Sequence, residues 1–324
     1  MRSHQLLYLS RNDVEAVALD MKTLIDLLDA AFKEKGAGRV EMPPKPGLHT
    51  RPDAFIHAMP AFIPALGAAG MKWVSGYPEN HTRGLPYISG LLILNDTATG
   101  IPSVVMDCTW ITASRTAAAS ALAARYLARA GSRTLGILAC GVQGRTNLQA
   151  IATLFPIERV YAYDVLPDAQ RRFVAEMNAS TGIDIIGVDH PKKAVEVSDI
   201  VVTSGPILKR PSPVIQKDWL RAGAFAAALD FDSYWTGDAL KQVDKLVTDD
   251  LAQYKYYQNV GYFQQTPDPS ADLGEIVTGG KPGREREDER TMAMNLGLAL
   301  EDMAVAVEID RRARERGIGT WLSL

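Results

Sequence analysis

Residues 134–164 read TLGILACGVQGRTNLQAIATLFPIERVYAYD, and this stretch decides the fold. An apolar run over 134–140 leads into the turn Ala139–Gly144, then into a helical pattern over 142–155 and a second apolar run over 159–165. A strand, a tight turn, a helix and a second strand in this order are typical of a dinucleotide-binding βαβ unit. The stretch therefore predicts a parallel sheet that helices cover on both faces.

The same alternation continues to about residue 250. Apolar runs predict further strands, and amphipathic patterns between them predict helices. This rhythm predicts a Rossmann-type doubly wound α/β domain. The expected helices cover 167–180 and 191–198, and the expected strands cover 183–188, 199–205, 224–230 and 245–250.

The rest of the chain has a different texture. One or two amphipathic helices are expected within 11–35, with Asn12 or Asp13 as the cap. Short apolar runs between Pro and Gly predict a strand-rich region over 40–107. A helix is expected to begin near Thr112 and end at Gly131, and a long helix is expected over 289–316.

Composition excludes several classes of function. Of 324 residues, 47% are hydrophobic, and 35 Lys and Arg face 38 Asp and Glu, a formal net charge of −3. The length predicts two domains with packed cores, and the weakly acidic balance argues against nucleic-acid binding. No apolar window reaches the roughly 18 residues of a membrane span, and residues 1–13 lack a signal-peptide core. We expect a cytoplasmic protein without membrane or nucleic-acid partners.

Two cysteines complete the compositional picture. Cys108 and Cys140 stand in apolar contexts, which favours buried thiols over a disulfide. No metal site is predicted.

The turn after the first apolar run has the chemistry of a dinucleotide site. Gly141 and Gly144 let backbone N–H groups and a helix N-terminus approach a pyrophosphate, although Ala139 replaces the usual first glycine. Asp164 closes the next strand, 23 residues after Gly141, where a carboxylate binds ribose hydroxyls and repels a 2′-phosphate. The sequence therefore predicts NAD rather than NADP. The alternative is a tight turn with Asp164 capping the helix that begins at Pro167.

Three cations lie in unusual settings. Lys45 is bounded by prolines, Lys72 lies inside an apolar stretch, and Arg115 is surrounded by small residues. A buried cation is costly unless it is paired. Each of them therefore either meets an internal carboxylate or binds an anionic ligand.

These residues belong to a longer series of motifs. In chain order they are MPPK, AMPAF, GMKWVSGYPEN, RGLP, LILNDTATGIP, MDCTWITASRTAAASA, CGVQG, LGEIVTGGKPGR and GLALEDMAVA. The series covers nearly the whole chain and resembles the ornithine cyclodeaminase/mu-crystallin family. That family includes NAD-dependent cyclodeaminases, alanine dehydrogenases, ketimine and iminosuccinate reductases, and the non-enzymatic mu-crystallins.

The resemblance implies a domain plan. Residues 1–118, completed by 300–324, would form an α/β domain that binds substrate and dimerises, and residues 119–299 would form the NAD-binding Rossmann domain. It also implies a homodimer and a small amino-acid or imino-acid substrate.

The resemblance also implies roles for individual residues. A substrate clamp would comprise Lys45, His57, Lys72 and Arg115, and the catalytic residues would be Asp232 and Lys72. The cofactor would be bound by Arg115, Gly141, Val142, Gln143, Asp164, Thr203, Ser204 and Asn295.

The chain departs from the family pattern at three places. Asp230–Trp235 reads DFDSYW where cyclodeaminases have a Gly-rich stretch, so the geometry around Asp232 is open to question. His57 stands where alanine dehydrogenases have a clamping Arg, and Asn295 stands where the family usually has Ser. We expect Glu301 and Asp302 to be structural.

Further cations near the clamp suggest a hypothesis about the substrate. If several of them reached the site, they would suit a second carboxylate, as in iminosuccinate, although loop solvation explains them equally well. They are His49, Arg51, His57 and Arg83.

The leading prediction is an NAD(H)-dependent imine reductase or amino-acid dehydrogenase. Lys72 and Arg115 would anchor the substrate carboxylate, and Asp232 would exchange a proton with the substrate nitrogen. One alternative is a cyclodeaminase-type lyase that returns the hydride, which the altered DFDSYW segment disfavours. The other is a binding protein without turnover.

Overall fold

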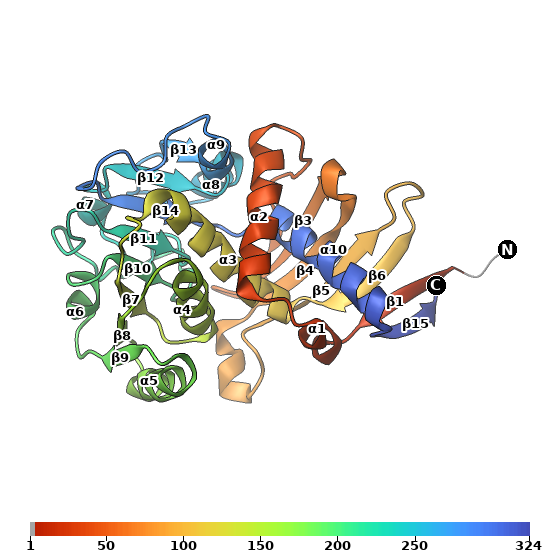
Figure 1. Cartoon of the computed structure of the whole chain (residues 1–324), viewed down its shortest axis with the longest axis horizontal. Coiled ribbons are helices and arrows are strands. Elements are labelled where there is room, and N and C mark those ends of the chain that lie inside the picture. Colours follow the sequence, from red (N-terminus) through yellow and green to blue (C-terminus); the bar gives the residue numbers. More distant parts are fainter. Residues whose placement is uncertain (1–3) are drawn as a thin grey trace. The chain divides into compact units, whose positions relative to one another are not determined.

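The computed structural model describes residues 4–324, apart from the side chain of His81, and divides the chain into two compact units (Figure 1). The first unit runs to Arg115 and is completed by Gly297–Leu324, and the second comprises Thr116–Leu296. The sequence places the corresponding boundaries at 118/119 and 299/300, three residues later in each case.

Within the described residues, the first unit contains a seven-stranded sheet in the order β15-β1-β6-β5-β4-β3-β2. Strand β1 is parallel to β6 and antiparallel to β15, and all other neighbours are antiparallel. The strands are β1 Gln5–Leu9, β2 Gly47–Leu48, β3 Phe55–Ile63, β4 Ala68–Gly76, β5 Ile88–Asn95, β6 Pro102–Asp107 and β15 Thr320–Ser323.

Helices cover one face of this sheet. Figure 1 shows α10 lying across β3, β4 and β5, with α2 packed beside it. From Lys72 to Gly76, alternate residues of β4 are buried, as expected for a strand with one covered face. The helices of this unit are α1 Arg11–Val17, α2 Met21–Gly36 and α10 Ala299–Arg316, with the 3₁₀ turns η1 Pro64–Leu66 and η2 Pro78–Arg83.

The two helices expected within 11–35 are present, but their caps differ from the prediction. Ser10 is the N-cap of α1, and Asp13 completes a capping box with it. Ala18 adopts a left-handed conformation (φ 53°) that ends α1, and Asp20 caps α2. The capping box explains why Asp13 stands in the first turn without being the cap.

The second unit contains an eight-stranded, all-parallel sheet in the order β13-β12-β14-β11-β10-β7-β8-β9. Its central strands are buried along their whole length, as expected for strands covered on both faces. The predicted Rossmann-type fold class is confirmed. The strands are β7 Thr134–Leu138, β8 Arg159–Tyr163, β9 Asp184–Gly187, β10 Ile200–Thr203, β11 Phe225–Ala228, β12 Lys245–Thr248, β13 Ala271–Asp272 and β14 Thr291–Met294.

The prediction of one helix over 289–316 is wrong for its first part. Residues Thr291–Met294 form β14, which is buried between β11 and β12, and α10 begins only at Ala299. A short buried strand reads as a continuous apolar run, which periodicity cannot separate from a buried helix. The helix expected at Thr112–Gly131 is α3 Thr109–Leu127.

Of the remaining helices of the second unit, the first three match helices expected from the sequence, and the last three were not expected. They are α4 Val142–Leu154, α5 Pro167–Thr181, α6 Pro191–Val195, α7 Gly237–Leu240, α8 Leu251–Asn259 and α9 Leu273–Val277. Within residues 4–324, no helix combines the length and the apolar character that crossing a membrane would need.

Candidate active site

The strand order of the second unit identifies its ligand-binding edge. Strands β8 and β9 extend from one side of β7, and β10, β11, β14, β12 and β13 extend from the other side. In open α/β sheets, ligands bind at the carboxyl ends of the strands where the order reverses. Here those are the ends of β7 and β10, which are followed by the turn Ala139–Gly144 and by Ser204–Gly205.

The turn after β7 has the geometry that a pyrophosphate needs. Ala139 adopts φ 79°, which explains why a glycine is usual at this position. A Cβ at Gly144 would lie 2.7 Å from the Ala139 carbonyl oxygen, so Gly144 permits the close packing of α4 on β7. Gly141 is the N-cap of α4 without a side-chain cap, and a Cβ there would meet nothing within 4 Å. An uncapped helix N-terminus with open space beside it fits an anionic group.

Asp164 stabilises this turn through hydrogen bonds to the backbone. Its Oδ2 accepts a hydrogen bond from the Cys140 backbone N at 2.7 Å, and its Oδ1 accepts one from the Leu166 N at 2.8 Å. Leu166 is the N-cap of α5 and has no side-chain cap bond. Asp164 therefore orders the start of the following segment as well as the turn, and Val165–Pro167 brings no cation that would pair with a 2′-phosphate.

The other predicted cofactor residues of this unit differ in their burial and in the hydrogen bonds that their side chains make within the protein. The Asn147 amide donates to Gln143 Oε1 at 3.2 Å, and Val142 is 63% exposed. Ser204 Oγ donates to the Ala139 carbonyl at 3.3 Å. Asn295, at the end of β14, is buried, and neither its Oδ1 nor its Nδ2 has a hydrogen-bond partner within the described part of the chain. A buried orphan amide at the carboxyl edge fits a polar group of a bound cofactor.

The first unit brings Lys72 and Arg115 together on one carboxylate. Lys72 Nζ donates to Asp302 Oδ1 at 2.6 Å, and Arg115 Nε donates to the same oxygen at 2.9 Å. Arg115 Nη1 also donates to Glu301 Oε2 at 2.6 Å. Lys72, Glu301 and Asp302 are fully buried. Both cations therefore have internal carboxylate partners, the first of the two alternatives that the sequence left open.

Lys45 joins this cluster through the backbone. Its Nζ donates to the Gly297 carbonyl at 2.8 Å, and a Cβ at Gly297 would lie 2.6 Å from Arg115 Nη1. Gly297 has φ 76°, so a side chain there would be strained as well as crowded. Lys45 and Arg115 thus border the same glycine, immediately before α10.

His57 lies on the same face of the sheet as Lys72. On β3 and β4, His57 is opposite Val74 and Met59 is opposite Lys72, and directly opposed residues share a face. The imidazole stacks on Phe55 with ring centroids 4.3 Å apart. The structure therefore brings the four predicted substrate-binding residues into one unit.

Burial sets the ionisation of this cluster. Burial, with help from Lys45, His49 and Lys72, lowers the pKa of His57 to about 3, so its imidazole is neutral at pH 7. Burial and the neighbouring Arg115 lower the pKa of Lys72, whereas Asp302 raises it. Burial and Asp302 raise the pKa of Glu301 against the effect of Arg115.

Asp232 and Asp230 stand in the second unit, beyond the end of β11. Asp232 is 8% exposed, and its Oδ2 accepts a hydrogen bond from Thr266 Oγ1 at 3.1 Å. Burial raises the pKa of Asp232 and the Thr266 bond lowers it. Asp230 is fully buried and accepts hydrogen bonds from Thr203 Oγ1 at 2.8 Å and from the Gly205 N at 3.1 Å. The hydroxyl of Thr203, a predicted cofactor residue, is thus used inside the protein.

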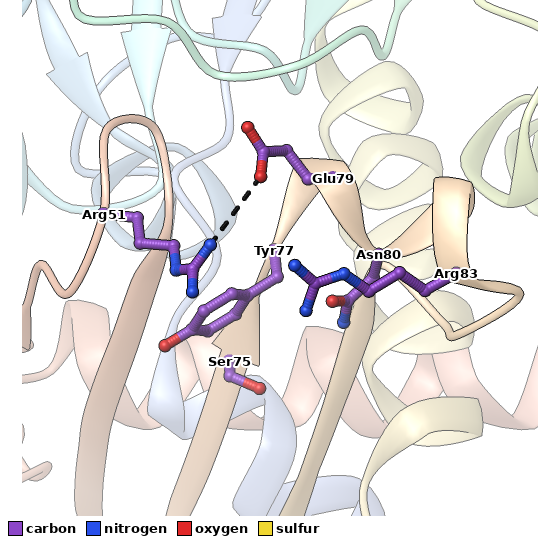
Figure 2. A pocket seen from close by; sticks show the side chains of 6 residues that line it. All are labelled: Arg51, Ser75, Tyr77, Glu79, Asn80 and Arg83. Atoms are coloured by element: carbon purple, nitrogen blue, oxygen red, sulfur yellow. Dashed lines mark ion pairs between the residues drawn. The ribbon is translucent and has the colours of Figure 1, made fainter.

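Arg51 and Arg83 do not join His57. They line a separate pocket of about 280 Å³ (Figure 2) together with Ser75, Tyr77, Glu79 and Asn80. Ser75 lies three residues after Lys72 on β4, and successive strand residues alternate between faces, so the two side chains lie on opposite faces. Figure 2 shows Arg51 and Arg83 on either side of Tyr77, with Arg51 paired to Glu79 at 3.9 Å.

Sequence reasoning missed two features of the site. The first is the pairing of Glu301 and Asp302, expected only to be structural, with Lys72 and Arg115. The second is the pair of hydrogen bonds by which Asp230 holds the segment after β10. One sequence feature could have revealed the pairing of Glu301 and Asp302 with buried cations. It is the presence of two adjacent acids in the apolar stretch LALEDMAVA, which contains no basic residue. Nothing in the sequence connects Asp230 with Thr203, because the contact depends on the parallel pairing of β10 and β11.

The cysteines are free and buried, as the sequence predicts. Burial raises the pKa of Cys108 to about 11 and that of Cys140 to about 12, which leaves both thiols protonated at pH 7. Among the described residues, no group of three or more His, Cys, Asp or Glu side chains is arranged to hold a metal ion.

Comparison with known proteins agrees with this architecture. The sequence model of the ornithine cyclodeaminase/mu-crystallin family matches residues 5–317. Alanine dehydrogenase of Archaeoglobus fulgidus is 33% identical over 98% of both chains. The Δ1-pyrroline-2-carboxylate reductase of Thermococcus litoralis, solved with NADH and L-proline, is 34% identical and superposes with a TM-score of 0.89 over 97% of this chain and 99% of that one.

An archaeal alanine dehydrogenase dimer with bound NAD is 32% identical, with a TM-score of 0.88 over 99% of this chain and 100% of that one. Both solved relatives were determined with NAD or NADH.

Proposed function

This chain belongs to the ornithine cyclodeaminase/mu-crystallin family, and from that premise we propose that it is an NAD(H)-dependent oxidoreductase that interconverts a small 2-imino acid and the corresponding 2-amino acid. The oxidoreductase class and the NAD cofactor match the relatives named above. The observation that carries the proposal for this chain is the convergence of Lys45, Lys72 and Arg115 from three separate segments next to α10.

We propose that these cations bind the substrate carboxylate. An ammonium has three donors, and Lys72 Nζ has two acceptors within the described chain, Asp302 Oδ1 and Thr112 Oγ1. Asp302 fixes the directions of Lys72 and Arg115 at once, which is the preorganisation that a carboxylate clamp requires. The ion pairs therefore support the clamp by orienting it.

The proposed cofactor residues of the second unit are Gly141, Val142, Gln143, Asp164, Thr203, Ser204 and Asn295. Arg115 of the first unit is proposed to contribute as well. A bound nicotinamide would supply or accept the hydride. We propose that Asp232 gives a proton to the substrate nitrogen in the reductive direction and takes it back in the oxidative one. Burial raises the pKa of Asp232, which suits a carboxyl that must hold a proton.

A panel of substrates tests the reaction type. The purified chain is mixed with NADH and either pyruvate plus ammonium or Δ1-pyrroline-2-carboxylate, and separately with NAD and ornithine. A reductase consumes NADH in proportion to product, whereas a cyclodeaminase forms proline from ornithine without a net change in nicotinamide absorbance. Product from ornithine alone, or NADH binding without turnover of any member, contradicts the proposal.

The number of carboxylates on the substrate is a finer question. His57 is neutral and Arg51 and Arg83 line a different pocket, so these residues provide little positive charge for a second carboxylate near Lys72. We therefore favour a monocarboxylate over iminosuccinate. A higher kcat/KM with oxaloacetate plus ammonium than with pyruvate plus ammonium would reverse this preference.

We further propose a homodimer, cytoplasmic as the sequence predicts. Trp73 and Leu91 are cross-strand partners on β4 and β5, and they are 41% and 46% exposed. They lie on the face of the sheet opposite Lys72, which is the face that α10 leaves open. We propose that this exposed apolar pair forms part of the interface between two copies of the chain. Light scattering should report a dimer, and Trp73→Glu should shift it toward the monomer.

A further inference from the structure

Asp230 holds the backbone that follows β10. Both of its carboxylate oxygens are used: Oδ1 accepts from Thr203 Oγ1 at 2.8 Å, and Oδ2 accepts from the Gly205 N at 3.1 Å. The side chain is 0% exposed. The end of β10 and the first residues beyond it are therefore tied to the segment that follows β11.

Two aromatic residues of the same segment complete this arrangement. Trp235 Nε1 donates to Thr203 Oγ1 at 3.2 Å, so the Thr203 hydroxyl is left to donate to Asp230. Tyr234 packs on Gly205 so closely that a Cβ there would lie 2.2 Å from Cε2 of the ring. The three residues Asp230, Tyr234 and Trp235 come from the DFDSYW stretch, where the chain departs from the family pattern.

The tied backbone lies at the ligand-binding edge of the sheet. The Ser204 N donates to the Leu138 carbonyl at 3.0 Å, and Ser204 Oγ donates to the Ala139 carbonyl at 3.3 Å. Ser204 thus connects the end of β10 to the turn that begins α4. On the same edge, beyond β11, the buried amide of Asn295 has no partner within the described chain, which points independently to a ligand.

We propose that Asp230 is a positioning residue of the cofactor site, which holds Ser204–Gly205 against the end of β7 so that the dinucleotide meets a preformed backbone. This inference rests on the proposed NAD(H) function and deepens it. The role belongs to Asp230 rather than to Asp232, whose Oδ2 accepts a hydrogen bond from Thr266 Oγ1 rather than from the segment after β10.

The charge of Asp230 gives this role a pH dependence. Burial, aided by Asp232, raises the pKa of Asp230 to about 7, against the hydrogen bonds from Thr203 and Gly205. Burial also raises the pKa of Tyr234, the other titratable group that interacts with Asp230, so the phenol stays neutral. Ionised Asp230 adds a negative charge near the edge that binds the anionic pyrophosphate. Affinity for NADH should therefore fall as the pH rises through about 7.

The test measures the Kd of NADH by fluorescence titration of the full chain between pH 6 and 8.5. Asp230→Ala should raise the Kd by about 10-fold, the loss expected when positioning hydrogen bonds are removed. Thr203→Val should raise it by less, and the double variant should be no worse than Asp230→Ala. Asp230→Asn should bind NADH with a Kd that no longer rises with pH. Asp232→Asn is the matched control, expected to lower kcat while retaining the NADH Kd at pH 6. Its Kd should still rise with pH, with the midpoint moved slightly downward because Asp232 no longer raises the pKa of Asp230.

The outcomes separate this inference from the proposal on which it rests. If the wild-type chain does not bind NADH, the proposed function and this inference both fail. If the wild type binds NADH and a folded Asp230→Ala chain binds it equally well, this inference alone fails. It also fails if Asp230→Asn keeps the pH dependence of the wild type. Should Asp230→Ala not fold, Thr203→Val and the wild-type pH profile decide in the same way.

Discussion

Asp302 in the first unit and Asp230 in the second are both fully buried carboxyl groups, yet their surroundings are opposite. Asp302 lies between two cations, with Lys72 and Arg115 on the same oxygen. Asp230 has a hydroxyl and a backbone N–H as donors and no cation. Burial alone therefore does not decide what a buried acid does, because its partners matter as much. The cations beside Asp302 make it part of an ion cluster, whereas Asp230, which has neutral donors only, is a group that titrates near neutral pH.

The largest expected effect is a loss of stability when Asp302, the acid paired with two cations, is replaced. Asp302→Asn leaves the buried Lys72 and Arg115 without their shared carboxylate, and breaking a buried ion pair in this way costs about 3–5 kcal/mol. Urea unfolding followed by circular dichroism measures the loss. Asp310→Asn is the matched control on α10, because its partner Arg314 is partly exposed, and we expect a loss below about 1 kcal/mol there. Equal losses for the two variants would contradict the assigned role.

The next effect concerns the pH dependence of stability and is expected at Asp230. Its pKa is raised from the ordinary 3.8 to about 7 in the folded chain, so between these values the folded state holds a proton that the unfolded state has released. Stability from this group is therefore present at low pH and is lost as the pH rises from about 4 to 7, by up to about 4 kcal/mol. Asp230→Asn should flatten this part of the profile. An unchanged slope would show that Asp230 does not titrate in this range.

A smaller effect tests whether the ion cluster of the first unit binds substrate. Lys72→Met removes one anchor of the proposed clamp and should lower kcat/KM by about 100-fold. The Kd of NADH should stay the same, because Lys72 is not among the proposed cofactor residues and Arg115 keeps its bond to Glu301. Lys22→Met, an exposed lysine of α2 paired with Asp26, serves as the control. Retention of kcat/KM in a folded Lys72→Met chain would exclude Lys72 from the site.

The smallest effect sharpens the contrast between Asp230 and its neighbour Asp232. Thr266→Val removes the hydrogen bond to Asp232 Oδ2 and should cost about 1 kcal/mol of stability. Because that bond lowers the pKa of Asp232, its loss should move the alkaline limb of the pH–rate profile for imine reduction to higher pH, by about one unit or less. A downward shift would argue against Asp232 as the proton donor.

Much of the molecule could be predicted from the order of its residues. Local periodicity placed the strands of the second unit from β7 to β12 and most of the helices between them, because each pattern reports the local environment of a few neighbouring residues. The turn at Ala139–Gly144 was recognisable because its small residues have a local cause, the close approach of α4 to β7. The motif series identified the family without any tertiary information.

Other features depended on contacts between distant segments. Lys72 and Asp302 are 230 positions apart, and Arg115 and Asp302 are 187 positions apart, so no local pattern could pair them. The same holds for Thr203 and Asp230, which meet because β10 and β11 are adjacent in the sheet. Strand β14 was taken for helix because its place between β11 and β12 is a property of the sheet.

The sequence by itself thus determined the fold class, the family, the dinucleotide turn and the identity of the unusual cations. Only the tertiary structure decided which carboxylates those cations meet, that His57 shares their face of the sheet, and that Asp230 holds the end of β10. The physical reason is that propensity and periodicity act over a few residues, whereas ionisation and hydrogen bonding depend on whichever groups the completed fold places within about 3 Å.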